Sequence, residues 1–401
     1  MVHKLETIDL ETRFKIISKT FSMLEQYFAH WNYVPNVSIN KLHKKYVKDL
    51  LTTENRYKFG LLMCKLLAEL RNGHTFYYDR QLHNKTGGSL GFYAFYHEKE
   101  KKWAVLSSSI NKLKIGYVIL KINGEPTEKF FIAASKYISG SSELEIRNKL
   151  FKTSFLFPKG LKITTDRGTF AINKMPLKFS AIKPEPVFEL IDKKTCYVKL
   201  PSFAKSEYAK SAVKFLKKHR DCESIIMDLR NNEGGNTPAN LISALMNRKY
   251  RRFAYKEVIQ EQISYILDST YVKRNKIKTR YKLQKSKCTT PLKSAYNGKV
   301  FILVNQFTLS AGEDFSFPFK DNGRATLIGI KTAGTNGSAL IKDFGDGIYL
   351  GMGVVQVIYP NGTRFEGIGI KPDIEVYPAI SDIKQGKDHI LERAISLARK
   401  S

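Results

Sequence analysis

A serine lies where an apolar run gives way to a helix. The run Val300–Val304 predicts a strand, and Ser310–Glu313 predicts the start of a helix shortly after it. Amides at a helix start point outward and favour negative charge, so an oxyanion that forms beside Ser310 would be stabilised there. The same residues also fit a capping box, in which the Ser310 hydroxyl only satisfies amides of its own helix. The stretch therefore predicts either a nucleophile or a helix cap.

Two adjacent glycines, Gly234 and Gly235, follow a second predicted strand, Ile225–Leu229. Glycines between a strand and a helix allow the backbone to approach an anion closely. The alternative is an ordinary strand-to-helix loop. A nucleotide-binding loop is excluded, because neither G-x-G-x-x-G nor G-x-x-x-x-G-K-[ST] occurs here. The glycine pair is therefore a candidate anion site without nucleotide chemistry.

His74 stands at the end of an apolar helix that is predicted near Asn55–Arg71 and stops at Asn72-Gly73. A histidine at a helix C-terminus interacts favourably with the helix dipole and needs no further role. The position of His74 alone therefore indicates only that a packed helix holds this residue in place.

The composition excludes several classes of protein. The chain has 401 residues, and 67 Lys+Arg against 37 Asp+Glu give a formal charge of +30, with a local excess between positions 273 and 287. This charge admits an anionic partner, but no zinc finger, RRM signature or helix-turn-helix pattern is present. We expect no specific nucleic-acid partner, and acidic peptides are a second possible ligand class.

No run of residues is long and apolar enough for a membrane span, and no secretory leader is visible, so we expect a cytoplasmic location. Export by a route that the sequence does not show is the alternative. The four cysteines, Cys64, Cys196, Cys222 and Cys288, are scattered without metal-ligand spacing. We therefore expect no metal and no organic cofactor. The oligomeric state stays open.

Periodicity divides the chain into three parts. Residues 1–80 carry apolar positions at helical spacing, residues 87–180 carry short alternating strands and the turn Asn123-Gly124, and residues 187–401 alternate strands with helices. One long helix is expected over 127–151. The last part predicts an α/β architecture whose sheet is at least partly parallel.

The middle part resembles a PDZ-like domain, because it contains the loop Ser89-Leu90-Gly91-Phe92 and the run Val118–Gly124. In that family the loop offers backbone amides to the terminal carboxylate of a peptide. The resemblance implies peptide binding at Leu90, Gly91 and Phe92, although Ser89 stands where the family's loop opens with glycine.

Four ordered motifs extend the resemblance to nearly the whole chain. The sequence is similar to the tail-specific (C-terminal-processing) serine peptidases in the motifs Asp228-Leu229-Arg230-x-Asn232-x-Gly234-Gly235, Leu303-Val304-Asn305-x-x-Thr308-x-Ser310-Ala311-x-Glu313, Thr332-x-Gly334 and Gly369-Ile370-x-Pro372-Asp373-Ile374. This implies an α/β core of the ClpP/crotonase-like type behind a helical N-terminal segment and a PDZ-like β-rich domain.

The resemblance also implies roles for single residues. Ser310 matches the nucleophile, and Thr335 stands where many members carry a lysine base, so the chain looks like the tricorn-type branch. In that branch a histidine is the base and a glutamate orients it, which gives His74 and Glu366. Tricorn has a serine where this chain has Gly73.

These roles agree with the chemistry. A serine hydroxyl needs an adjacent base, a neutral imidazole suits that task, and a carboxylate fixes its tautomer. The amides of Ala311 and of Gly234 or Gly235 would hold the oxyanion. Two alternatives stay open: Glu366 as a solvent-facing strand residue, and Lys331 or Lys342 as a substitute base.

The predicted function is hydrolysis of peptide bonds in unfolded proteins or peptides, through an acyl-enzyme on Ser310. The first rival is a non-catalytic ligand- or peptide-binding protein on the same fold. The second rival is an anion-surface binder driven by the charge of +30.

Overall fold

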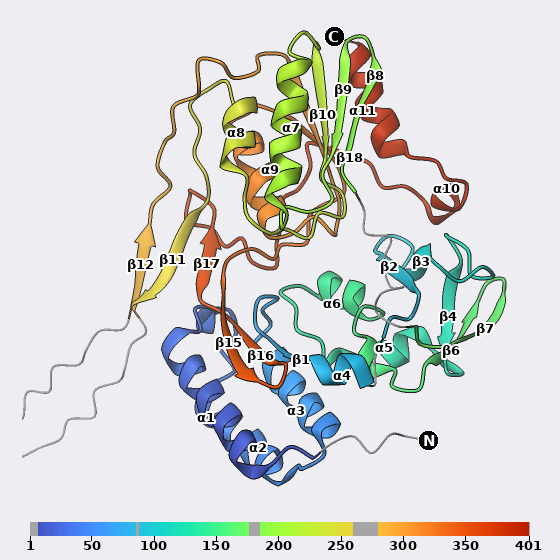
Figure 1. The fold of residues 1–401 in the computed structure, drawn as a ribbon, viewed down its shortest axis with the longest axis vertical. Coiled ribbons are helices and arrows are strands. Elements are labelled where there is room, and N and C mark those ends of the chain that lie inside the picture. Colours follow the sequence, from blue (N-terminus) through green and yellow to red (C-terminus); the bar gives the residue numbers. More distant parts are fainter. Residues whose placement is uncertain (1–6, 86–87, 176–184, 260–279, 401) are drawn as a thin grey trace, which may run out of the picture.

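A computed structural model describes residues 7–85, 88–175, 185–259 and 280–400. An α/β core lies at the top of Figure 1, a helical part lies below it, and a second β-rich part lies beside the helical one. We call residues 88–175 the middle module and residues 185–400 the core. The predicted boundary positions 87 and 176–184 lie outside the described residues, as do positions 273–279 of the basic stretch.

The helical part is built from three capped helices, α1 (Leu10–Tyr27), α2 (Ile39–Thr52) and α3 (Arg56–Ala68). The side chains of Asp9, Ser38 and Asn55 accept the first free amides of these helices. The short helical turn η1 (Trp31–Tyr33) and helix α4 (Arg80–Lys85) complete the helices of this part.

Late residues of the chain complete the helical part. Strand β1 (Phe76–Asp79) pairs antiparallel with β16 (Ile348–Gly353), which also pairs with β15 (Ala339–Gly345). Buried residues of β16, such as Leu350 and Met352, share one apolar cluster with α1 to α3. The first eighty residues therefore bury their apolar faces only together with a hairpin that follows the core helices in sequence.

Helix α3 ends earlier than expected. The sequence predicted a helix up to Arg71, but α3 stops at Ala68 and Arg71 takes a positive φ of 48°. His74 therefore lies in a turn that leads into β1, well beyond the helix end.

The middle module is a twisted sheet with two helices. Its strands are β2 (Phe92–His97), β3 (Lys102–Ser108), β4 (Val118–Ile122), β5 (Glu125–Pro126), β6 (Leu161–Thr165) and β7 (Gly168–Ile172). They are ordered β2-β3-β4-β6-β7, with β5 paired to β4. Asn123 and Gly124 both have positive φ, as a two-residue hairpin turn requires.

The expected single helix over 127–151 is wrong. The structure has α5 (Thr127–Ser135) and α6 (Glu143–Lys149), followed by the turn η2 (Ser154–Leu156). Ser142 caps α6 by accepting the Glu145 amide, so a second helix starts there instead of continuing the first. The connection between α5 and α6 points toward the core, where it contributes to the candidate active site.

The core is a six-stranded sheet of order β18-β14-β13-β10-β9-β8. The strands are β8 (Val187–Asp192), β9 (Thr195–Lys199), β10 (Ser224–Asp228), β13 (Lys299–Val304), β14 (Thr326–Gly329) and β18 (Ile374–Glu375). All neighbours pair in parallel except β8, which runs antiparallel to β9. The predicted α/β architecture with a partly parallel sheet is therefore confirmed.

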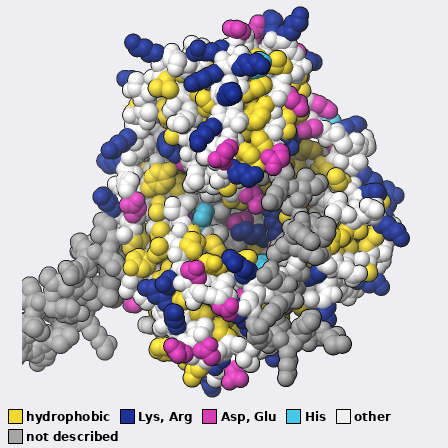
Figure 2. Space-filling model, viewed as in Figure 1, with side chains coloured by type: hydrophobic (Ala, Val, Ile, Leu, Met, Phe, Trp, Pro, Cys, Tyr) yellow, Lys and Arg dark blue, Asp and Glu magenta, His cyan; other side chains and the backbone are white. Residues whose placement is uncertain are grey.

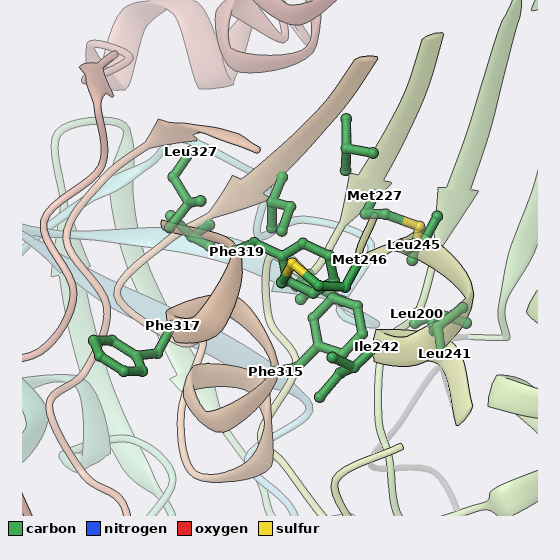
Figure 3. Packing of buried hydrophobic residues seen from close by; sticks show 14 of the residues in the cluster. Leu200, Met227, Leu241, Ile242, Leu245, Met246, Phe315, Phe317, Phe319 and Leu327 are labelled. Carbon is green, nitrogen blue, oxygen red and sulfur yellow. The ribbon is translucent and has the colours of Figure 1, made fainter. Parts of the chain in front are cut away.

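Helices cover both faces of this sheet (Figure 1). One face packs on α7 (Ser206–Lys218), α8 (Ala239–Leu245) and α9 (Ala311–Asp321), and the other packs on α11 (His389–Arg399), which follows α10 (Ile380–Lys384). Figure 3 shows how Phe315 and Phe319 of α9 point into side chains such as Met227 of β10 and Met246 beyond α8. This buried cluster holds α9 in place. It thereby also fixes the position of Ser310, the residue immediately before α9.

A fourth, small sheet joins the core to the helical part. It has the order β12-β11-β17, from β11 (Ala254–Ile259), β12 (Arg280–Gln284) and β17 (Val355–Ile358). Among the described helices, none is long and apolar enough to cross a membrane.

Candidate active site

Ser310 stands at the sharp turn between β13 and α9, in a strained conformation. Its φ of 53° and ψ of −122° lie in a region that residues other than glycine rarely occupy. The Ser310 side chain makes no capping hydrogen bond to its helix. The capping-box alternative is therefore wrong, and the hydroxyl is left available for another role. A strained serine at a strand-to-helix turn is the geometry that exposes a nucleophile.

Glu313, the other half of the expected capping box, is used elsewhere. This fully buried carboxyl group accepts hydrogen bonds from Thr332 Oγ1 at 2.5 Å, the Gly334 amide at 2.7 Å and the Thr335 amide at 3.1 Å. Burial raises its pKa to about 8, although these three donors lower it. The Thr335 carbonyl in turn accepts the Ser310 amide at 2.8 Å. Glu313 thus holds the loop that supports the strained serine.

The glycine pair lies directly against the serine. A Cβ on Gly234 would fall 2.7 Å from Ser310 Cβ and 3.0 Å from the Ala311 nitrogen, so a side chain at this position would displace the start of α9. The Gly234 amide donates to Asn232 Oδ1 at 2.9 Å. In contrast, the amides of Gly235 and Ala311 donate to no acceptor within the described part of the chain. Of the three predicted oxyanion donors, these two are free.

His74 is half-buried at the same place, and its ring is unpaired. Nδ1 is buried without a partner among the described residues, and no hydrogen bond joins the ring to Ser310 or Glu366. The His74 amide donates to Asn72 Oδ1 at 3.1 Å, which fixes the backbone. Burial lowers the pKa of His74 to about 4, so the imidazole is neutral at pH 7, as a general base must be.

Glu366 is buried and does not face solvent. Its side chain is 1% exposed, and Oε1 accepts from Asn72 Nδ2 at 2.9 Å and from Ser141 Oγ. Among the described residues, the second oxygen, Oε2, receives only the Asn336 amide, at a long 3.4 Å. Burial raises the pKa of Glu366 to about 8. The solvent-facing alternative is therefore wrong, and Oε2 is the oxygen with capacity for a further donor.

Three residues that the sequence did not single out for the site connect the predicted ones. Ser141 Oγ accepts the Gly73 amide at 2.8 Å, and Thr335 Oγ1 lies 2.7 Å from both Ser141 Oγ and Glu145 Oε2. A Cβ on Gly73 would fall 2.6 Å from Glu145 Oε1 and 2.8 Å from Thr335 Oγ1. Gly73 thus leaves room for these two side chains. Only Thr335 carried a signal in the sequence, because it replaces the lysine of the related dyad.

The two candidate substitute bases are poorly placed for that role. Lys331 is exposed and Lys342 is partly exposed on β15. A lysine acts as a base at neutral pH when burial depresses its pKa, and neither of these side chains is buried.

The predicted peptide-binding loop of the middle module is largely engaged within its own module. Leu90 and Phe92 are buried in the module's apolar cluster, and the Gly91 amide donates to Ser89 Oγ at 3.0 Å. The side chain of Met175 lies against Gly91, where an added Cβ would fall 2.9 Å from its sulfur. The role of this loop in peptide binding stays a prediction.

Figure 2 shows a hollow in the face of the molecule between the core and the parts below it, bordered by acidic, basic and histidine side chains. Among the described residues, no cluster of three or more His, Cys, Asp or Glu side chains has the geometry of a metal site. A strained serine with free neighbouring amides, a neutral imidazole and a buried carboxyl group form the kind of site that serine hydrolases use.

Comparison with known proteins finds a matching family model. Residues 194–376 match the model of peptidase family S41. The chain is 29% identical over 274 residues to a carboxyl-terminal-processing protease of Picosynechococcus sp., which covers 65% of this chain and 60% of that protein. It is 31% identical over 185 residues to a probable CtpA-like serine protease of Staphylococcus epidermidis, covering 45% of this chain and 33% of that protein. The chain thus spans less than two thirds of the length of each of these relatives.

Solved structures agree on the fold. Mature CPAF superposes with a TM-score of 0.70 at 14% identity, over 97% of this chain and 96% of that one. The photosystem II D1 C-terminal processing protease superposes with a TM-score of 0.56 at 17% identity, over 93% and 96%. These structures share the fold of the chain, residues 194–376 match the S41 model, and the resemblance to the tail-specific protease family is confirmed.

Proposed function

We propose that the protein is a serine peptidase that hydrolyses peptide bonds in unfolded proteins or peptides. The observation that carries this proposal is Ser310: its backbone is held in a strained conformation, its hydroxyl does not cap the helix, and two free amides lie beside it. Strain of this kind costs about 1–3 kcal/mol and persists where the surrounding structure enforces it. A helix cap would not need it.

The first step of the proposed reaction is the attack of Ser310 Oγ on the peptide carbonyl carbon. His74 takes the hydroxyl proton as the new C–O bond forms, and the amides of Gly235 and Ala311 receive the carbonyl oxygen as it becomes an oxyanion. The imidazolium then gives the proton to the leaving amine, which breaks the C–N bond. Water, activated by the same imidazole, releases the acyl group from Ser310.

Glu366 orients the base in this proposal. Its Oε2 is available to accept His74 Nδ1–H, and its negative charge would stabilise the imidazolium. No hydrogen bond joins His74 and Glu366 among the described residues, so the proposed mechanism requires the two side chains to approach when substrate binds. Catalytic hydrogen bonds commonly tighten in this way.

We propose further that the middle module is PDZ-like and that the core is of the ClpP/crotonase-like type. The strand order of the module and its loop before β2 support the first part, and the parallel sheet between layers of helices supports the second. The formal charge of +30 favours acidic peptides among the substrates. The cytoplasmic location predicted from the sequence stays a prediction.

The test compares the full-length chain with Ser310→Ala. We expect the parent to cleave unfolded protein and fluorogenic peptides and to be labelled by a fluorophosphonate. We expect Ser310→Ala to lose roughly 10⁶ in turnover, the scale of a lost triad serine, together with the label. Ser338→Ala is the matched control, because this serine is exposed.

Equal cleavage by Ser310→Ala and its parent would show that Ser310 is not the nucleophile. A parent that binds peptides but neither cleaves nor takes the label would support the non-catalytic rival. Retention of nucleic acid or acidic lipid that disappears with added salt, without cleavage, would support the anion-surface rival.

A further inference from the structure

Ser141 lies where three separate segments of the chain meet. It belongs to the connection between α5 and α6 of the middle module, and its side chain is 6% exposed. Its Oγ accepts the Gly73 amide at 2.8 Å, donates to Glu366 Oε1, and lies 2.7 Å from Thr335 Oγ1. One hydroxyl therefore touches the segment of the base, the orienting carboxyl group and the loop that supports Ser310.

Thr335 continues the contact to a second carboxyl group. Its Oγ1 lies 2.7 Å from Ser141 Oγ and 2.7 Å from Glu145 Oε2. The side chains thus form an unbroken row, from Glu366 through two hydroxyl groups to Glu145. Both hydroxyl-bearing residues and both carboxyl groups are buried.

The two ends of this row differ in charge. Glu145 is paired with Lys149 at 2.5 Å and also accepts the Ser141 amide at 2.6 Å, and these contacts lower the pKa of Glu145 against the effect of its burial. Glu366 has no such cation, because the Arg364 guanidinium donates to the backbone carbonyl of Glu366 at 2.5 Å. The row therefore has one fixed negative end and one end that can gain or lose a proton near neutral pH.

Counting protons shows how the hydrogen bonds of the row change with the ionisation of Glu366. A hydroxyl group has one proton to donate. When Glu366 is protonated, its O–H can donate to Ser141, Ser141 to Thr335, and Thr335 to Glu145. When Glu366 is ionised, Ser141 donates to Glu366 and Thr335 donates to Ser141, while Glu145 keeps its bonds from Lys149 and the Ser141 amide. A change of ionisation at Glu366 thus turns both hydroxyl groups and breaks or restores the Thr335 hydrogen bond to Glu145.

We propose that Ser141 and Thr335 form a hydroxyl bridge that positions Glu366 for the relay and couples its ionisation to the Glu145–Lys149 pair. This inference rests on the proposed peptidase function. The middle module then supplies part of the active centre, namely Ser141, Glu145 and Lys149. Thr335 takes part in this bridge at the position where many relatives carry a lysine base.

Other charged groups face Glu366 and act on its ionisation as well. Glu145 and Glu313 are like charges that disfavour the carboxylate, whereas Arg364 favours it. Tyr33 also lies within electrostatic reach. The charges of these groups act on Glu366 directly through space and not through the Ser141 hydroxyl, so removal of this hydroxyl reports the contribution of the bridge.

The experiment measures the titration of Glu366 in two ways on the full chain. The pH dependence of kcat/KM with a fluorogenic peptide reports the active relay, and carbon-13 carboxyl NMR, with the Glu366 signal assigned by its loss in Glu366→Gln, reports the group without turnover. Hydrogen bonds to a carboxylate favour its charged form. We expect Ser141→Ala to raise the pKa of Glu366 by about 1, and to lower kcat/KM at pH 7 by about tenfold with KM nearly unchanged.

Two further variants make the result specific. Thr335→Val keeps the shape and removes the second hydroxyl, and we expect a smaller shift in the same direction that does not add to that of Ser141→Ala. Ser139→Ala is the matched control, because this serine lies in the same connection and, within the described residues, its hydroxyl donates to no acceptor. Ser141→Thr should restore the parental titration.

Each outcome decides something. Superimposable titrations of the parent and Ser141→Ala, or an equal shift in Ser139→Ala, would overturn the bridge. If Ser141→Ala does not fold, Thr335→Val breaks the same bridge from its other end, and an unchanged titration there would overturn it too. A parent that shows the NMR shift pattern but cleaves no peptide would disprove the peptidase proposal and leave the bridge standing.

Discussion

Two buried carboxyl groups border the segment that carries His74, and they behave differently. Glu145 of the middle module is 4% exposed and paired with Lys149, and its pKa is lowered. Glu366 of the late chain is 1% exposed and has hydrogen-bond donors but no ion pair with a side chain in the described residues, and burial raises its pKa to about 8. Burial is thus nearly equal, and the ionic partner decides the charge. One carboxyl group is a fixed structural charge, and the other is poised to change.

Among the tests of this difference, the substitution Glu366→Gln should have the largest effect on activity. A glutamine keeps the shape and can accept the Ser141 hydroxyl, but it cannot stabilise an imidazolium by charge. We expect kcat/KM to fall by about 10³–10⁴, as for an uncharged replacement of the orienting acid in a triad. The measurement is steady-state peptide cleavage, with fluorophosphonate labelling to show that Ser310 is still accessible. A loss below about threefold would contradict the orienting role.

The pH dependence of kcat/KM in the parent protein also tests the role of Glu366, and the expected effect is smaller. The His74 imidazole is neutral throughout the neutral range, because its pKa is lowered to about 4, so Glu366 with its pKa near 8 governs the acid limb. We expect kcat/KM to rise about tenfold per pH unit between pH 6 and 8 and then to level off. A profile that is flat over this range would show that Glu366 is already ionised or is not needed.

Stability should depend on pH with opposite sign at the two groups. The raised pKa of Glu366 gives stability that is present below pH 4 and lost as the pH rises toward 8, whereas the lowered pKa of Glu145 gives stability that is lost in acid. In urea unfolding of the parent and Glu366→Gln, we expect the variant to lack a decline of up to about 1 kcal/mol per pH unit between pH 5 and 8. Equal slopes would contradict the assignment.

Glu145→Gln should show the smallest effect on chemistry and a clear one on folding. The substitution leaves Lys149 without its partner, and we expect a loss of about 1–3 kcal/mol in the free energy of unfolding near pH 7. Because no hydrogen bond among the described residues joins Glu145 directly to His74 or Glu366, we expect kcat/KM to fall by no more than about tenfold. Adding Lys149→Met should recover part of the stability. A loss of activity as large as that of Glu366→Gln would erase the distinction between the two groups.

The two predicted glycine loops show where the sequence was sufficient and where it was not. Both were expected to present amides to an anion. Beside Ser310 the Gly235 and Ala311 amides are free, whereas in the middle module the Gly91 amide is engaged by Ser89. A glycine shows that a backbone can approach closely, but whether its amide stays free depends on neighbours that sequence spacing does not reveal.

Strand β2 gives a related example. It is an edge strand of the middle module, yet the Tyr96 amide and carbonyl are bonded to the side chains of Asn148 and Gln306, at 2.9 Å and 3.1 Å. Gln306 lies only four residues before Ser310. The edge that an added peptide strand would use is therefore engaged at Tyr96 by the core and by α6, and no periodicity in the sequence foretold this.

The sequence by itself determined the α/β class of the core, because this follows from local periodicity and turn residues, and its resemblance to the tail-specific peptidases supplied the candidates Ser310, His74 and Glu366. Tertiary structure alone decided that Ser310 is strained and does not cap its helix, that Glu366 is buried, and that Ser141, Glu145 and Thr335 connect these parts. The physical reason is that a charge state or a free hydroxyl depends on groups brought together from positions up to hundreds of residues apart, whereas a helix or a strand depends mainly on its own neighbours.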